Sequence, residues 1–171
     1  MTDPSLQQAL RESTEEVLEK MFFIQCLGES LASESEPDVV AHLTFEGDPS
    51  GALTLTVAAS VARSVAADFL AAEEPDLSEQ EIREVVCELA NMICGSVLSR
   101  VESSATFRLG SPRIVASKSD PTDFAPEPGG SPPSIGGARS IVHAVKIGSG
   151  RMVVSINTET PAWSKTARYA F

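Results

Sequence analysis

The sequence predicts an α+β domain in which helices pack against an antiparallel sheet. Two observations support this fold class: apolar residues recur at helical spacing in some segments and alternate with polar residues in others. The expected order is a helix, a β-hairpin, two helices and then paired C-terminal strands. The helical segments are residues 4–25, 60–70 and 77–102. The strand segments are residues 39–45, 53–57, 107–109, 113–116, 140–147 and 151–157.

Length and composition indicate one soluble domain, residues 1–171, large enough for a proper core. The hydrophobic fraction is 42% and the charged fraction 22%, as in ordinary globular proteins. No stretch is long and apolar enough to span a bilayer, and the N-terminus lacks the basic-then-apolar order of a signal peptide. We therefore expect a cytoplasmic protein with no membrane partner. The formal net charge of −11 argues against nucleic-acid binding, which needs clustered Lys and Arg.

The cysteines and histidines do not form a metal-binding or catalytic pattern. The three cysteines, Cys26, Cys87 and Cys94, make neither an even disulfide framework nor a metal-ligand pattern. Cys87 and Cys94 are seven residues apart, on one side of a predicted helix, and we expect both thiols to be buried. His42 is expected on the polar face of a strand and His143 on an apolar face, in the core or an interface. A zinc site or a Cys-His catalytic pair is not expected.

The two shorter helices have recognisable boundaries. Pro4 suits the first helical position, and Gly28 is the expected stop of the first helix. The apolar run 21–23 near its end predicts burial there. Ser60 is the expected N-cap of the second helix. The expected buried side of that helix consists of Val61, Val65, Ala66, Phe69 and Leu70.

The longest predicted helix, residues 77–102, has the best-specified start. Ser78 and Glu81 form a capping box, and Leu77 with Ile82 supplies the matching hydrophobic staple. One apolar stripe then runs along the helix at helical spacing. It consists of Ile82, Val86, Leu89, Ile93 and Val97.

A second stripe of this helix is polar and carries two residues that disfavour helices. Its members are Glu81, Glu84, Glu88, Asn91 and Gly95. Inside a helix, Asn costs about 0.5 kcal/mol relative to Ala, and Gly costs about 1 kcal/mol. Placing both on one face of the best-specified helix points to a role for that face.

The residue types suggest what this face can do. Glu88 and Asn91 are three apart and emerge from neighbouring points, and Gly95 leaves room for close approach. A carboxylate and an amide can orient a water molecule for attack on an electrophile that a partner supplies. No activated nucleophile with an adjacent base is present. Periodicity alone favours a simpler interpretation, a solvated acidic face that keeps the protein soluble.

The motif resembles that of the CheC/CheX/FliY family of chemotaxis phosphatases. That family carries Asp or Ser, three residues, Glu, two residues and Asn on one helix, with a Pro some twenty residues further on. Here the stretch runs from Glu84 through Glu88 to Asn91, followed by Pro112, and ELANMICG is close to the CheX-like form. EVLEKMFF is similar to the family's first helix, and FEGDPSGALTLTVAASVARSVAADFL to its hairpin and following helix.

The resemblance implies a CheX-like fold and a specific activity. Such a protein dephosphorylates the aspartyl phosphate of a CheY-like response-regulator receiver domain. By this resemblance Glu88 docks the receiver's lysine and Asn91 orients the attacking water, while Glu84 supports the site and Gly95 gives clearance for the partner. No cofactor is expected in this chain, because the receiver holds the Mg²⁺ ion. A homodimer that shares strands between subunits is also implied.

Two departures from the family pattern bear on this implication. Glu84 replaces the usual Asp or Ser. CheC-like members carry Glu-x-x-Asn in both halves of a pseudo-repeat, whereas the first helix here has Glu16 followed by Glu19, so that only the long helix matches. The Pro/Gly-rich residues 117–137 are expected to be a loop inserted into the core.

Two other interpretations remain open from the sequence. The chain can be a non-catalytic module that keeps the fold and docks a receiver domain or another signalling partner. It can also be a structural dimer whose 117–137 loop carries a separate interaction.

Overall fold

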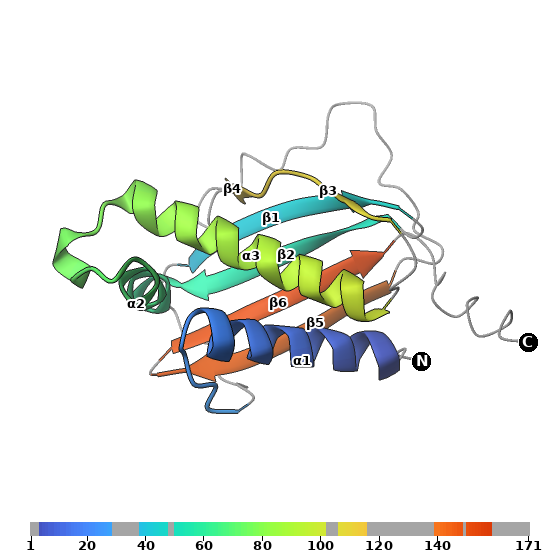
Figure 1. Ribbon diagram of the computed structural model, residues 1–171, viewed down its shortest axis with the longest axis horizontal. Helices are drawn as coiled ribbons and strands as arrows, with labels where there is room; N and C mark the ends of the chain where they lie inside the picture. The colour runs from blue at the N-terminus through green and yellow to red at the C-terminus, as the bar shows by residue number, and fades with distance from the viewer. Residues whose placement is uncertain are drawn as a thin grey trace, which may run out of the picture.

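The computed structural model describes residues 4–28, 38–47, 50–101, 106–115, 139–148 and 150–158. Within these ranges, three α-helices lie on one face of an antiparallel sheet (Figure 1), which confirms the predicted α+β class. The helices are α1 (Pro4–Met21), α2 (Ala59–Leu70) and α3 (Glu79–Val101), with a short 3₁₀ turn, η1 (Glu74–Asp76). The strands are β1 (Asp38–Glu46), β2 (Gly51–Ala58), β3 (Arg108–Leu109), β4 (Arg113–Val115), β5 (Arg139–Ile147) and β6 (Gly150–Thr158).

Two hairpins form most of the sheet. Strands β1 and β2 pair so that Leu43 lies opposite Leu53, and β5 and β6 pair so that Ile141 lies opposite Ile156. The hairpins join through antiparallel pairing of β2 with β6, which gives the order β3-β1-β2-β6-β5. Both predicted hairpins are therefore confirmed.

Strands β3 and β4 together form one interrupted edge. Both pair with β1, β3 at its Phe45–Glu46 end and β4 at residues 40–42. The Gly110 N–H donates to the Thr44 carbonyl at 2.7 Å, and the segment then leaves the ladder at Ser111 and Pro112. Since proline has no N–H to donate, Pro112 suits this interruption.

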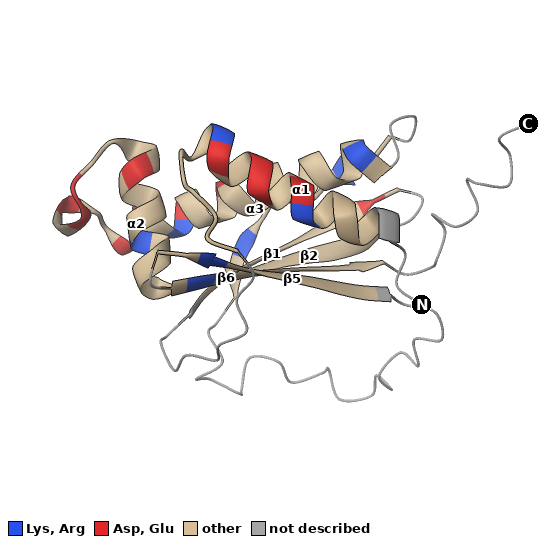
Figure 2. Cartoon of the chain, turned by 90° about the horizontal axis from the view of Figure 1, so that it is seen from below, with Lys and Arg blue, Asp and Glu red and all other residues tan. Residues whose placement is uncertain are grey.

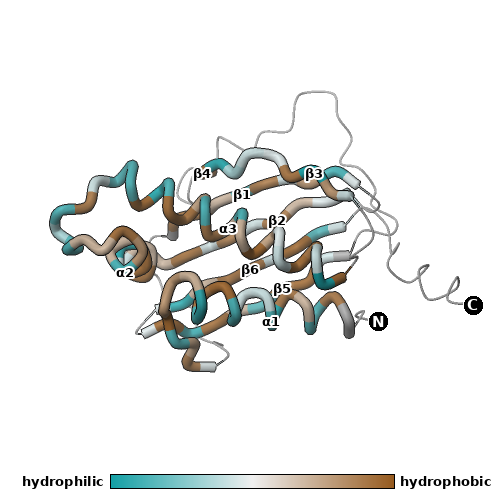
Figure 3. Tube along the Cα trace, viewed as in Figure 1, coloured by the Kyte–Doolittle hydropathy of each residue, from teal (hydrophilic) through white to brown (hydrophobic). Residues whose placement is uncertain are grey.

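The core lies between the sheet and the helices. Helix α3 contacts β1 and β2, while α1 contacts β5 and β6 and packs beside α3 (Figure 1). Figure 2 shows this layering from the side, and Figure 3 shows hydrophobic residues along the central strands. The largest fully buried side chains include Leu10, Phe22, Phe45, Leu55, Leu89, Ile93, Met152 and Ile156.

The end of α1 differs from the prediction. The helix stops at Met21, and Phe23 adopts a left-handed backbone conformation with φ of 56°. The Ile24 N–H then donates to the Leu18 carbonyl at 2.9 Å, a closure typical of helix C-termini. This turn buries Phe22, which stacks on Phe69, but leaves Phe23 86% exposed. The predicted burial of 21–23 was therefore right for Phe22 and wrong for Met21 and Phe23, and Gly28 is not the stop.

The start of α2 also differs. Strand β2 runs into the helix without a loop, so the N-cap is Ala58 and no side chain caps this end. Ser60 is already inside the helix, and the predicted cap was wrong. Val61 and Val65 are buried as predicted, but Phe69 and Leu70 are partly exposed because they occupy the last turn.

The predicted loop at residues 117–137 lies outside the described residues. The predicted single domain, residues 1–171, also includes residues outside the described ranges.

The capping box at the start of α3 is confirmed. The Ser78 Oγ accepts the Glu81 N–H at 3.1 Å, and the Glu81 carboxylate accepts the Ser78 N–H at 2.8 Å. This backbone hydrogen bond, with one from the Ser78 hydroxyl, lowers the pKa of Glu81. Leu77 and Ile82, the predicted staple, are both buried. The first turn of α3 is thus fixed at both the backbone and the core.

Removing this cap tests its contribution. We expect Ser78→Ala to lower the free energy of unfolding by about 1 kcal/mol, because the Glu81 N–H loses its partner. Urea denaturation measures the change. The matched control is Ser99→Ala on the last turn of the same helix, which should change it by less than about 0.5 kcal/mol. Equal effects of the two substitutions would contradict the role of the cap.

Candidate functional site

The orientation of α3 is fixed by its apolar stripe. All five residues of the predicted stripe are buried, and Val85, Ala90, Cys94 and Leu98 extend the buried surface. A helix buried along this side against the sheet has little freedom to rotate about its axis. Its polar stripe therefore faces away from the core along much of its length.

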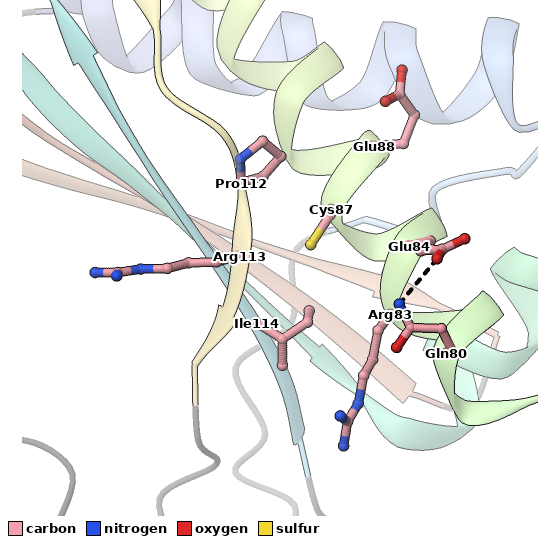
Figure 4. Close-up of a pocket in the computed structure, with 8 residues that line it drawn as sticks. All are labelled: Gln80, Arg83, Glu84, Cys87, Glu88, Pro112, Arg113 and Ile114. Atoms are coloured by element: carbon pink, nitrogen blue, oxygen red, sulfur yellow. Dashed lines mark hydrogen bonds between the residues drawn. The ribbon is translucent and has the colours of Figure 1, made fainter.

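The polar stripe places the predicted site residues on one surface. Glu84 and Glu88 are exposed, while Asn91 and Gly95 are partly exposed further along the helix. Glu84 accepts a hydrogen bond from the Gln80 amide at 2.9 Å (Figure 4). The side chains of Glu88 and Asn91 form no hydrogen bond or ion pair with any described residue. Their side chains are therefore available to a partner.

A pocket of about 400 Å³ lies beside Glu88, between α3 and the interrupted edge strand. The strand contributes Pro112, which the sequence places far from Glu88 but the fold brings next to it (Figure 4). Asn91 and Gly95 are outside this pocket, further along the same face. The residues that line it are Gln80, Arg83, Glu84, Cys87, Glu88, Pro112, Arg113 and Ile114.

Sequence reasoning missed Gln80, Arg83, Arg113 and Ile114 as members of this site. The two strand residues are brought there by pairing of β4 with β1, which no local pattern reveals. Gln80 and Arg83 were identifiable only as neighbours of the polar stripe. Their inclusion depends on where β4 lies relative to α3.

The cysteine prediction was right for Cys94 and wrong for Cys87. Cys94 is fully buried, whereas Cys87 is only partly buried because its side chain lines the pocket. Burial raises the pKa of the Cys94 thiol to about 12. Burial, with a smaller effect of the Glu84 charge, also raises the pKa of Cys87. Cys87 is thus protonated at neutral pH and poorly suited to act as a nucleophile.

The corresponding stretch of α1 is occupied by ion pairs. Glu16 pairs with Lys20 at 2.6 Å and also with Arg100 of α3, and Glu12 pairs with the same arginine at 3.2 Å. Glu19 stands where the motif would need an amide. These contacts hold α1 against α3 at the surface, and they leave α1 without the pair of groups that α3 presents.

The histidines lie as predicted relative to the sheet. His143 is 7% exposed on the face covered by the helices. His42 is partly exposed on the other face, where its Nδ1 lies 3.1 Å from the Thr54 Oγ1. Partial burial and then the Arg113 charge lower the pKa of His42. Neither histidine lines the pocket beside Glu88.

The part of the chain that the structure describes holds no group of three His, Cys, Asp or Glu residues arranged to bind a metal ion. None of the described helices is both long enough and apolar enough to cross a membrane.

Comparison with known proteins decides the family. A family model described as chemotaxis phosphatase CheX matches residues 39–124, which include the hairpin, α2, α3 and the interrupted edge strand. The chain belongs to the CheX family. This match confirms the family resemblance inferred from Glu88, Asn91 and Pro112. No curated protein sequence matches the chain.

Solved structures with the same fold include several CheX proteins. The chemotaxis protein CheX of Vibrio vulnificus is 18% identical, with a TM-score of 0.67 over 91% of this chain and 97% of that one. A CheX-CheY-BeF3-Mg+2 complex from Borrelia burgdorferi contains a chain that is 16% identical, with a TM-score of 0.62 over 88% and 96%. FliY of Thermotoga maritima is 14% identical, with a TM-score of 0.58 over 99% and 96%. At these identities the likeness establishes the shared fold.

Gly95 gives a prediction that concerns stability. A Cβ placed on Gly95 would have no neighbouring atom within 4 Å, so the helix has room for a side chain there. We expect Gly95→Ala to raise the free energy of unfolding by about 1 kcal/mol, because alanine favours the helical backbone. Urea denaturation measures it. A stability equal to or below that of the wild type would show that the glycine serves the fold itself.

Proposed function

We propose that this CheX-family protein hydrolyses the aspartyl phosphate of a CheY-like response-regulator receiver domain. The observation that carries the proposal is the pair Glu88 and Asn91 on the outer face of α3, where neither side chain has a hydrogen bond or ion pair within the described chain. The pair lies in a chain of the chemotaxis phosphatase family.

In this proposal, Asn91 positions the attacking water. Its amide oxygen accepts a hydrogen bond from the water, which holds the water oxygen in line with the phosphorus. As the water oxygen bonds to phosphorus, the bond from phosphorus to the aspartyl oxygen breaks, and the receiver's aspartate leaves as a carboxylate. Phosphoryl transfer depends mainly on such positioning and on charge stabilisation, so this chain needs no nucleophile of its own.

Glu88 has a docking role in the same proposal. Its exposed carboxylate pairs with the lysine of the receiver's active site and sets the register of the two proteins. Asn91 is three residues further along α3 and therefore reaches the phosphoryl group from the same side. Gly95 leaves space for the receiver's loops, since its surroundings are open. The Mg²⁺ ion belongs to the receiver, where it neutralises charge on the phosphoryl oxygens.

The Borrelia burgdorferi structure supports this choice of partner. Its description names a CheX with CheY, BeF3 and Mg²⁺. A receiver domain is thus the chemically consistent partner for a chain that shares this fold and presents a carboxylate and an amide on α3.

The direct test is phosphate release from a phosphorylated CheY-like receiver domain. We expect Asn91→Ala to slow the release by about 100-fold or more at saturating protein, because the water is no longer oriented. Asn157→Ala is the matched control, since Asn157 is an exposed asparagine on β6. The control should act like the wild type.

The outcomes separate the candidate functions. Hydrolysis by Asn91→Ala at the wild-type rate would contradict the assignment of Asn91. Binding of the receiver with no acceleration by the wild type would support the non-catalytic module instead.

Glu88 is expected to affect docking more than the chemical step. Glu88→Gln keeps the size of the side chain but removes its charge, so we expect the KM for the phosphorylated receiver to rise about tenfold, with a smaller change in kcat. Steady-state kinetics at two salt concentrations measures both constants. Glu19→Gln, on the exposed surface of α1, is the control. An unchanged KM for Glu88→Gln would exclude the docking role.

A further inference from the structure

The pocket beside Glu88 is a second element of the same surface. Its floor is apolar and formed by Cys87, Pro112 and Ile114, all partly buried. In Figure 4 the Cys87 sulfur points toward the edge strand. Neither the family match nor the proposed roles of Glu88 and Asn91 assign a function to this pocket.

Charged groups stand along the α3 side of the pocket. In Figure 4 Glu88 lies on α3 at the level of Pro112, with its carboxylate directed away from the edge strand, and Arg83 lies on α3 nearer the level of Ile114. Glu84 lies on α3 between them. Arg83 forms no ion pair with another described residue. Arg113 contributes to the wall but points away from α3. The pocket therefore has an apolar floor, with the carboxylates of Glu88 and Glu84 and the unpaired guanidinium of Arg83 on its α3 side.

We propose that this pocket is a specificity pocket that accepts an apolar side chain of the receiver domain. The inference rests on the proposed function, in which the receiver already covers Glu88 and so reaches the pocket beside it. The complementary segment of the partner carries a lysine that meets Glu88, an apolar side chain that enters between Cys87 and Ile114, and a carboxylate that meets Arg83. The pocket thereby selects one receiver among several, because a receiver with a polar side chain at the central position would place it against the apolar floor.

A substitution that fills the pocket tests the proposal. The probe is a CheY-like receiver domain loaded with beryllofluoride and Mg²⁺, which binds without being hydrolysed. We expect Cys87→Phe to raise its Kd by about tenfold or more, because the ring occupies the space of the partner's side chain. Ser64→Phe, on the exposed surface of α2 and outside the pocket, is the matched control and should bind within about twofold of the wild type. On phosphorylated receiver, Cys87→Phe should raise KM and leave kcat within about twofold.

Thiol protection in the unmodified protein gives an independent measurement. Cys87 lines the pocket, whereas Cys26 lies next to Leu27, whose N–H donates to Lys146 on β5, at the opposite edge of the sheet. Burial, with smaller effects of the Glu15 and Glu19 charges, raises the pKa of Cys26 to about 11. Both thiols therefore react slowly enough for alkylation to be followed by mass spectrometry. We expect saturating loaded receiver to slow alkylation of Cys87 by about fivefold or more and to leave Cys26 unchanged.

The outcomes distinguish this proposal from the proposed function. A loaded receiver that binds while Cys87 is alkylated as fast as in the free protein overturns the pocket, even if Asn91→Ala abolishes hydrolysis. Hydrolysis that survives Asn91→Ala overturns the proposed function, whatever Cys87 shows. A CheY-like receiver that does not bind overturns both. If Cys87→Phe does not fold, as judged by circular dichroism, protection of Cys87 in the wild type decides.

Discussion

Burial of one side of α3 against β1 and β2 is the constraint on which the rest of the site depends. Leu89 and Ile93 are fully buried beneath the helix, so the helix cannot turn about its axis without exposing them. This fixed rotation holds Glu88 and Asn91 at the surface. The cap at Ser78 and Glu81 fixes where the helix begins. A carboxylate and an amide are thus held on a rigid element, as positioning catalysis requires.

The edge strand completes the surface. Pro112 and Ile114 of this interrupted strand lie alongside Cys87. The pocket that these residues line also reaches Glu88. In the proposed function, partner recognition is divided between α3 and the interrupted edge strand. We propose that the α3 face supplies the groups for docking and chemistry, and that the β4 edge supplies the shape of the pocket. The ion pairs of Arg100 with Glu12 and Glu16 occupy the corresponding region of α1, so between these two described helices only α3 presents such a face.

Local patterns in the sequence were sufficient for most of the fold. The β1-β2 hairpin, both C-terminal strands and the capped start of α3 follow from alternation, turn residues and a capping box, which act over a few neighbouring residues. The errors came at the ends of helices and at contacts between distant segments, which local preference does not determine. Phe23 is exposed because the backbone turns left-handed there, in a conformation that non-glycine residues seldom adopt. Ser60 is not a cap, because β2 continues directly into α2.

Cys87 is partly exposed because it lines the pocket, and the position of the pocket depends on where β4 pairs with β1. For the same reason the sequence does not reveal Arg83 and Ile114 as lining residues of the pocket, whereas Glu88 and Asn91 are proposed from a motif on one helix. The predicted homodimer stays a prediction.

The most direct measurement of the central claim is a crystal structure of this protein bound to a CheY-like receiver domain loaded with beryllofluoride and Mg²⁺. The account predicts that the Asn91 amide enters the receiver's active site, within hydrogen-bond distance of a water in line with the beryllium, and that Glu88 pairs with the receiver's lysine. A complex in which Asn91 remains in solvent while another surface contacts the receiver would contradict it.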